Sequence, residues 1–169
     1  MSEQKQPNFL VNAHAEPVSV QVHGKANYLN CNHFREFMET MLRAERAEIH
    51  INFAHCKGMD STFLGILAGT ALELKQHNPP GRLSISHLNE HNSELITNLG
   101  IQSLFHLEDL PGGEDSAGKL ASLENREVDD ASEVLQAHQN LVEAEPDNAG
   151  KFEDVIAFLK KQVEEESGR

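Results

Sequence analysis

The residues with the clearest chemical potential lie together in the stretch Met59-Asp60-Ser61-Thr62. A strand-like pattern precedes this stretch and a helix-like pattern begins at Ser61, which places the hydroxyl of Ser61 in the first turn of a helix. Unpaired backbone N–H groups and the positive end of the helix dipole converge there and stabilise a phosphate. Ser61 is therefore predicted to be a phosphorylation switch, with Thr62 as a second candidate. In the simpler alternative, Asp60 or Ser61 only caps the helix and contributes about 1 kcal/mol.

Two enzyme-like patterns are incomplete. His55, Asp60 and Ser61 supply the residue types of a hydrolytic triad, but Asp60 and Ser61 are adjacent and no G-x-S-x-G turn is present. Residues 113–120 nearly match a phosphate-binding loop, but Leu120 stands where a Ser or Thr must hold magnesium. We therefore predict that the protein is not an enzyme.

The chain contains ten histidines and two cysteines. Cys31 and Cys56 lack the spacing of a metal or redox motif, so we expect reduced, packed thiols. The run from His87 to His91 leaves a predicted strand and so lacks helical ligand geometry, and the histidines are therefore expected to be structural or exposed. The sequence predicts no metal and no cofactor.

Strand-like and helix-like patterns alternate along the first 110 residues. Valines and isoleucines recur with a period of two in the strands, and apolar residues recur at helical spacing between them. Alternation of this kind favours a sheet with helices packed against it. The predicted strands are residues 17–23, 48–53, 83–87 and the edge segment 104–107; the predicted helices are 32–42, capped by Asn30 or Asn32, 61–76 and 92–99; residues 54–60 are expected to form a loop.

The block at residues 47–69, AEIHINFAHCKGMDSTFLGILAG, resembles the conserved block of the STAS domain, the sulfate transporter and anti-sigma factor antagonist fold. The resemblance covers roughly residues 8–110 and implies an α/β fold, a mixed β-sheet flanked by helices. It also implies an anti-sigma factor antagonist that binds an anti-sigma factor with serine kinase activity and is phosphorylated by it on Ser61. Asp60 would shape the loop and the kinase contact. The partner-binding surface implied by the resemblance is Met59, Asp60, Thr62 and Phe63.

Phe63 departs from the family pattern, because antagonists of this family usually carry glycine at this position. An aromatic ring in the first helical turn either blocks a close-approaching partner or anchors one. A STAS subunit of a lipid-transporting ABC system, or a signalling scaffold without a phosphorylation cycle, therefore stays open as an alternative function.

The last 59 residues are more acidic than the rest of the chain. Residues 111–169 hold 6 basic and 15 acidic side chains, against 8 and 12 in residues 1–110. The Gly- and Pro-containing stretch after Leu110 suggests a boundary. We expect a STAS-like domain over 1–110, a linker over 111–128 and a helical hairpin over 129–166, with Pro146–Gly150 as its turn. The apolar stripes of the hairpin are expected to cover each other or the sheet, or to form a homodimer.

The net charge of −13 argues against nucleic-acid binding, which needs a basic face. No apolar run approaches the roughly 18 residues of a membrane span. The first residues, MSEQKQPNFL, lack the basic and apolar blocks of a signal peptide. We therefore expect a cytoplasmic protein whose partner is another protein.

Overall fold

Six strands form one mixed sheet in the computed structural model, which describes residues 8–108, 120–123 and 129–168. The order across the sheet is β5-β4-β3-β2-β1-β6. Strands β2, β3, β4 and β5 run parallel to one another, whereas β1 is antiparallel to both β2 and β6. The strands are β1 (Phe9–Asn12), β2 (Val18–Ala26), β3 (Glu48–Met59), β4 (Arg82–Ser86), β5 (His106–Glu108) and β6 (Ala121–Leu123).

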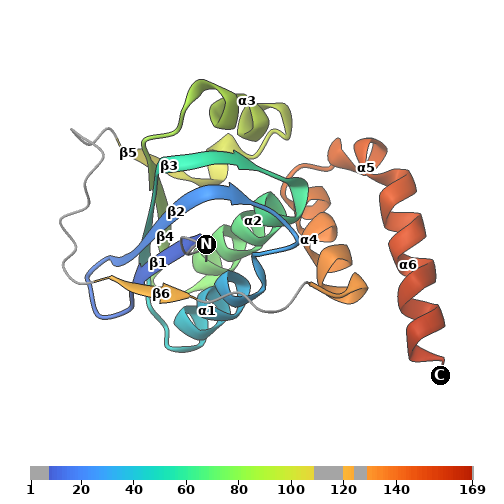
Figure 1. Cartoon of the computed structure of the whole chain (residues 1–169), viewed down its shortest axis with the longest axis horizontal. Coiled ribbons are helices and arrows are strands. Elements are labelled where there is room, and N and C mark those ends of the chain that lie inside the picture. The colour runs from blue at the N-terminus through green and yellow to red at the C-terminus, as the bar shows by residue number, and fades with distance from the viewer. Residues whose placement is uncertain (1–7, 109–119, 124–128, 169) are drawn as a thin grey trace, which may run out of the picture.

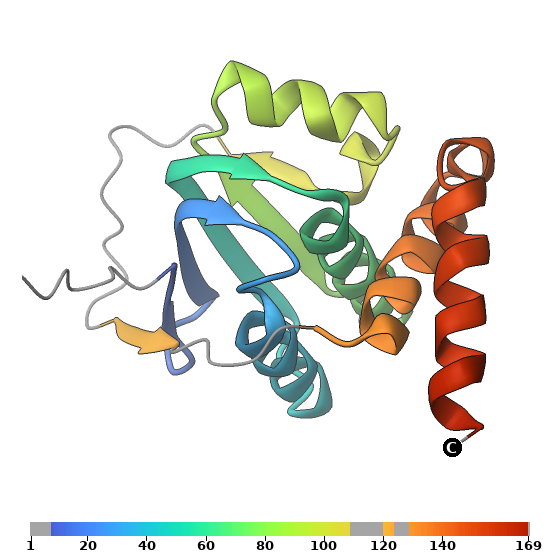
Figure 2. The same ribbon diagram turned by 45° about the vertical axis from the view of Figure 1, so that its right-hand side comes forward.

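The helices form successive layers beside this sheet. Helices α1 and α2 pack side by side against it, α4 lies on α2, and α6 lies outermost against α4 (Figure 1 and Figure 2). The α/β architecture predicted from the sequence is therefore confirmed. The helices are α1 (Asn32–Arg43), α2 (Ser61–Gln76), α3 (Glu90–Asn98), α4 (Ala131–Ala144), α5 (Asn148–Lys151) and α6 (Glu153–Ser167), with a 3-10 turn at Gln102–Leu104.

The hydrophobic core explains why α2 occupies the centre. Its buried residues lie around the whole helix, as is typical of a helix covered on several sides. The sheet covers one side of α2 with residues such as Ile51 and Ile85, and α4 covers another with Ala137 and Leu141. Helix α4 therefore shares the core of the sheet domain.

Three local expectations were wrong. Residues 54–59, expected as a loop, continue β3 because they pair with β2 through contacts such as Gly24 with Cys56. Helix α1 is preceded by Cys31, which makes no side-chain capping bond, and not by a capping asparagine. The expected turn after Pro146 contains the short helix α5.

Part of the segment expected as a linker belongs to the sheet. Residues 121–123 form β6, and Phe9 of β1 lies opposite Leu123. Residues 111–119, which hold most of the incomplete phosphate-binding loop, and residues 124–128 lie outside the described residues. Homodimer formation through the C-terminal helices stays a prediction. On α6, Val155 and Phe158 are the large apolar side chains that remain exposed.

Two stacked histidines should make stability depend on pH. The rings of His23 and His55 lie 4.7 Å apart. Burial and the charge of His55 lower the pKa of His23 below 6.5. The unfolded chain therefore binds a proton at a higher pH than the folded chain, so this contribution to stability is present above pH 6.5 and is lost as the pH falls below it.

The expected result is a smaller loss of stability between pH 7.5 and pH 5 in His23→Gln than in the unmodified chain. Urea unfolding at the two pH values measures it, and His14→Gln, in which an exposed histidine is replaced, is the matched control. An equal pH slope in His23→Gln and the unmodified chain would contradict the assignment.

Candidate functional site

Asp60 is the capping residue of α2. One carboxylate oxygen, Oδ1, accepts the backbone N–H of Phe63 at 2.9 Å. The other, Oδ2, accepts the backbone N–H of Tyr28 at 2.9 Å. The cap therefore also fixes the loop between β2 and α1 beside the start of α2, and Ser61 is left free of the capping role.

Ser61 is the first residue of α2, and its hydroxyl contacts α4. The Oγ atom of Ser61 lies 2.8 Å from Nε2 of His138, and Nδ1 of the same ring lies 2.8 Å from the carbonyl oxygen of Val134. A carbonyl only accepts, so Nδ1 carries a proton and donates it to Val134. In the tautomer whose single proton is on Nδ1, Nε2 accepts a hydrogen bond from the Ser61 hydroxyl.

This pairing replaces the triad considered from the sequence. Ser61 contacts His138 and not His55, whose ring stacks on His23 instead. His138 lies within the helical hairpin predicted over residues 129–166, but nothing in the sequence places it beside Ser61. The two residues are 77 positions apart, and no local pattern connects them.

The other predicted site residues lie at different depths. Met59 is partly exposed at the end of β3, but Thr62 is buried behind the first turn of α2. Phe63 is completely buried, and its ring lies 5.0 Å from that of Phe34 and 6.0 Å from that of Phe9. Because the side chains of Thr62 and Phe63 are both buried, neither offers a surface to a partner, and neither is proposed as a contact residue.

Helix α4 approaches α2 closely because two glycines leave room for it. A Cβ atom at Gly65 would lie 2.1 Å from the carbonyl oxygen of Ala137, and a Cβ atom at Gly69 would lie 2.4 Å from the side chain of Asn140. The side-chain amide of Asn140 also donates to the carbonyl of Gly65 at 3.1 Å. The two helices are therefore in backbone-to-backbone contact.

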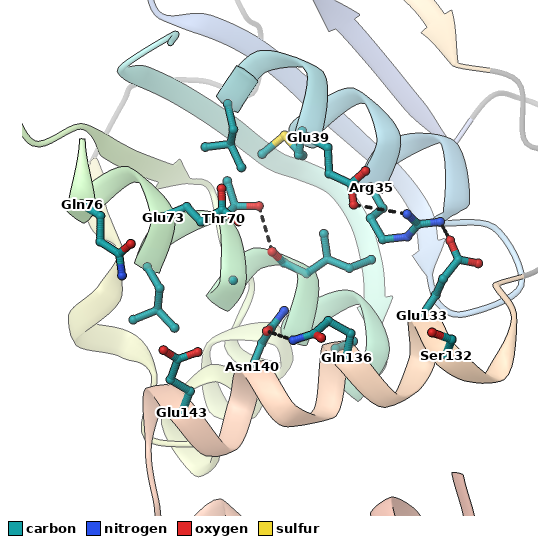
Figure 3. A pocket seen from close by; sticks show the side chains of 16 residues that line it. Arg35, Glu39, Thr70, Glu73, Gln76, Ser132, Glu133, Gln136, Asn140 and Glu143 are labelled. Atoms are coloured by element: carbon teal, nitrogen blue, oxygen red, sulfur yellow. Dashed lines mark hydrogen bonds and ion pairs between the residues drawn. The ribbon is translucent and has the colours of Figure 1, made fainter. Parts of the chain in front are cut away.

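The start of α4 is tied to α1 by a buried polar network. Asp129, whose side chain is nearly inaccessible, accepts from the Asn32 amide at 3.1 Å and lies 3.6 Å from the Arg35 guanidinium. Arg35 also pairs with Glu133 (Figure 3). Cys31 donates its thiol proton to Asp129 at 3.3 Å, and burial together with this carboxylate raises the pKa of the thiol. Both cysteines are free and buried.

A groove of about 450 Å³ lies between α1, α2 and α4. Figure 3 shows the carboxylates of Glu39, Glu73, Glu133 and Glu143 around it, with Arg35 at one end. Ser61 does not line this groove. Among the described residues, no group of three His, Cys, Asp or Glu side chains could hold a metal ion, and no helix there is both long enough and apolar enough to cross a membrane.

This chain is similar to known proteins in its fold and not in its sequence. No protein-family model and no curated protein matches the sequence. Several solved structures match, among them the anti-sigma factor antagonist SpoIIAA in its unphosphorylated form and the Bacillus cell fate determinant SpoIIAA in its phosphorylated form. Each has 18% sequence identity and a TM-score of 0.50. Each match covers 60% of this chain, and 88% and 90% of the respective SpoIIAA chains. The chain therefore has the α/β fold of SpoIIAA, the STAS fold that residues 47–69 predicted, with additional helices at its C-terminal end.

Proposed function

We propose that this chain is a non-enzymatic regulatory binding module that acts as an anti-sigma factor antagonist. In its unmodified form it binds a cytoplasmic anti-sigma factor with serine kinase activity, and phosphorylation of Ser61 releases that partner. The observation that carries the proposal is the position of Ser61, the first residue of α2, directly after the capping Asp60. SpoIIAA, which shares the fold, has been solved in both phosphorylated and unphosphorylated forms.

The surface beside Ser61 suits a protein partner. Tyr28 and Leu29 are large apolar residues with 46% and 50% of their surface exposed. The bond from the Tyr28 backbone to Asp60 holds them next to the first turn of α2. Together with the partly exposed Met59, they form an apolar surface beside the hydroxyl. Aromatic and other large apolar side chains of this kind are the usual anchors of protein interfaces.

A phosphate on Ser61 would change this surface by charge. It adds about −1.5 to −2 charges at pH 7. The helix N-terminus stabilises this charge, so α2 itself does not need to unfold. A partner that touches the unmodified hydroxyl would meet a dianion in its place, and its affinity would fall.

Capture of the partner from the protein's own cells tests this function. Intact-mass and phosphosite analysis is expected to find phosphate on Ser61 and a kinase-like partner with the unmodified chain. The affinity of that purified partner should fall at least about tenfold for Ser61→Asp, the loss that follows when about 1.4 kcal/mol of binding free energy is removed. Ser61→Ala should retain the affinity of the unmodified chain for this partner. Ser93→Asp, a change at an exposed serine on α3, is the matched control.

Equal affinities of Ser61→Ala and Ser61→Asp would contradict the switch. An unmodified Ser61 that co-purifies with a transport ATPase would contradict the antagonist function and favour the ABC accessory alternative.

A further inference from the structure

The surface of α2 that carries Ser61 is already in contact with another helix of the same chain, and Ser61 itself is partly buried. Ser61, Gly65 and Gly69 are spaced by four residues and therefore share one face of the helix, which we call the Ser61 face. All three meet α4: Ser61 at His138, Gly65 at Ala137 and Gly69 at Asn140. A neighbouring helix of the same chain thus covers the part of α2 that follows the capped turn.

Phosphorylation needs space around the Ser61 hydroxyl. In that reaction Oγ attacks the terminal phosphorus of a nucleoside triphosphate, the new O–P bond forms, the bond to the leaving diphosphate breaks, and the hydroxyl proton is lost. The kinase must surround Oγ to align this attack. In the structure, the buried ring of His138 lies 2.8 Å from Oγ and holds its hydrogen bond. Helix α4 and a kinase active site cannot occupy this position together.

We propose that α4 is an intramolecular competitor for the Ser61 face, so that modification of Ser61 and partner binding at this face both require α4 to leave α2. The proposal rests on the proposed function for the identity of the competing partner. The partner then binds only the fraction of chains in which α4 is detached, and its apparent Kd is the intrinsic Kd divided by that fraction.

Several contacts set how firmly α4 is held. Leu141, on α4 itself, is completely buried. The side-chain amide of Asn148, in α5, donates to the carbonyls of Leu99 at 2.8 Å and of Leu141 at 3.0 Å. These bonds connect the turn after α4 to the C-terminal end of α3. Arg35 holds the beginning of α4 through Glu133. These contacts lie away from Ser61, so they can be weakened without altering the hydroxyl or the first turn of α2.

The charge of the C-terminal helices favours detachment once Ser61 is modified. Residues 129–168 hold eleven acidic and three basic side chains, a net charge of −8. A phosphate dianion on Ser61 would add to the repulsion within this acidic region, and it does not fit within the 2.8 Å that separates Oγ from Nε2. A modified chain should therefore keep α4 away from α2.

Thiol labelling of the full chain tests the proposal without any partner. Ser61→Cys places a thiol at this partly buried position beside α4, and N-ethylmaleimide modification is followed by intact mass. Cys31 and Cys56 are both buried, so the unmodified chain gives a low background. Ser93→Cys, in which an exposed serine of α3 is replaced, is the matched reference. We expect the Ser61→Cys thiol to react at least about tenfold more slowly than the Ser93→Cys thiol, since labelling through a minor open state scales with its population.

Weakening α4 should then release this protection. Leu141→Ala or Asn148→Ala, each combined with Ser61→Cys, is expected to accelerate labelling of the introduced thiol at least about tenfold, because each raises the open population. The same two changes combined with Ser93→Cys should leave the labelling rate unchanged. If Leu141→Ala unfolds the chain, Cys31 and Cys56 will also be labelled. In that case the labelling rate of Ser61→Cys combined with Asn148→Ala is the result that tests the proposal.

Two results would overturn the proposal. One is labelling of Ser61→Cys as fast as Ser93→Cys when no other residue is changed. The other is slow labelling of Ser61→Cys that neither Leu141→Ala nor Asn148→Ala accelerates.

Failure of this test is separate from failure of the proposed function. Fast labelling would show that α4 does not protect Ser61, while the kinase partner and the phosphosite are decided by capture and mass analysis. Labelling of Ser61→Cys that is slow and is accelerated by weakening α4, with no kinase captured, would support the competitor role of α4 and reject the proposed identity of the partner.

Discussion

Replacing Phe63 by alanine is expected to lower the free energy of unfolding by about 3–5 kcal/mol, the usual cost of removing a buried phenylalanine ring. The ring is fully buried and packs on two others, Phe9 from β1 and Phe34 from α1, and meets Phe53 of β3 edge-on at a centroid distance of 6.4 Å. Phe63 thus joins the first strand and the first helix to α2. Its removal would leave a cavity where these elements meet.

Thermal unfolding measures this effect. For a chain of this size the midpoint should fall by roughly 6 to 20 °C. Phe158→Ala is the matched control, because the Phe158 side chain is 63% exposed on α6 and its removal should change stability little. Similar midpoints for the two variants would show that the aromatic cluster does not support the fold.

Replacing Gly65 by alanine is expected to separate α4 from α2. Alanine is favoured over glycine within a helix by about 1 kcal/mol, which alone would stabilise α2. The added Cβ atom, however, would lie 2.1 Å from the carbonyl oxygen and 2.8 Å from the Cα atom of Ala137, and these backbone atoms cannot turn aside. The steric clash should therefore outweigh the gain in helix propensity, and the free energy of unfolding should fall by about 1–3 kcal/mol or more.

Amide hydrogen exchange locates this loss. Exchange should rise across residues 131–144 and remain slow in β2 and β3. Gly150→Ala is the matched control, because no atom lies within 4 Å of its added Cβ atom, and this change should be neutral or stabilising by about 0.5–1 kcal/mol. Unchanged protection of α4 in Gly65→Ala would mean that the helices can shift apart at little cost.

The elements could be predicted from the sequence because their patterns are local. Alternating Val18, Val20 and Val22 gave a strand, and the run from Ser61 to Gln76 gave a helix with the observed bounds. The second half of β3 could not be predicted in this way. Residues 54–59 lack a clear apolar alternation, and they are extended because β2 offers them hydrogen-bonding partners.

The site could be predicted only in its local part. The order of Asp60 and Ser61 before an apolar run identifies the start of a helix, and the structure places both residues there. The meaning of Phe63 could not be predicted, because it depends on rings from β1, α1 and β3 that no spacing connects to it. The same holds for His138, which reaches Ser61 only because α4 packs on Gly65.

The sheet order has a consequence for the growing polypeptide during translation. Strand β1, at the start of the chain, is completed by β6 at residues 121–123, and α2 is covered by α4, which ends at Ala144. At about 5–20 residues per second, roughly 70 further residues take several seconds to synthesise after α2 has left the ribosome. During this interval the nascent chain carries Ser61 without its covering helix. Every molecule thus passes once through a state in which Ser61 has no contact with α4, before that helix has been made.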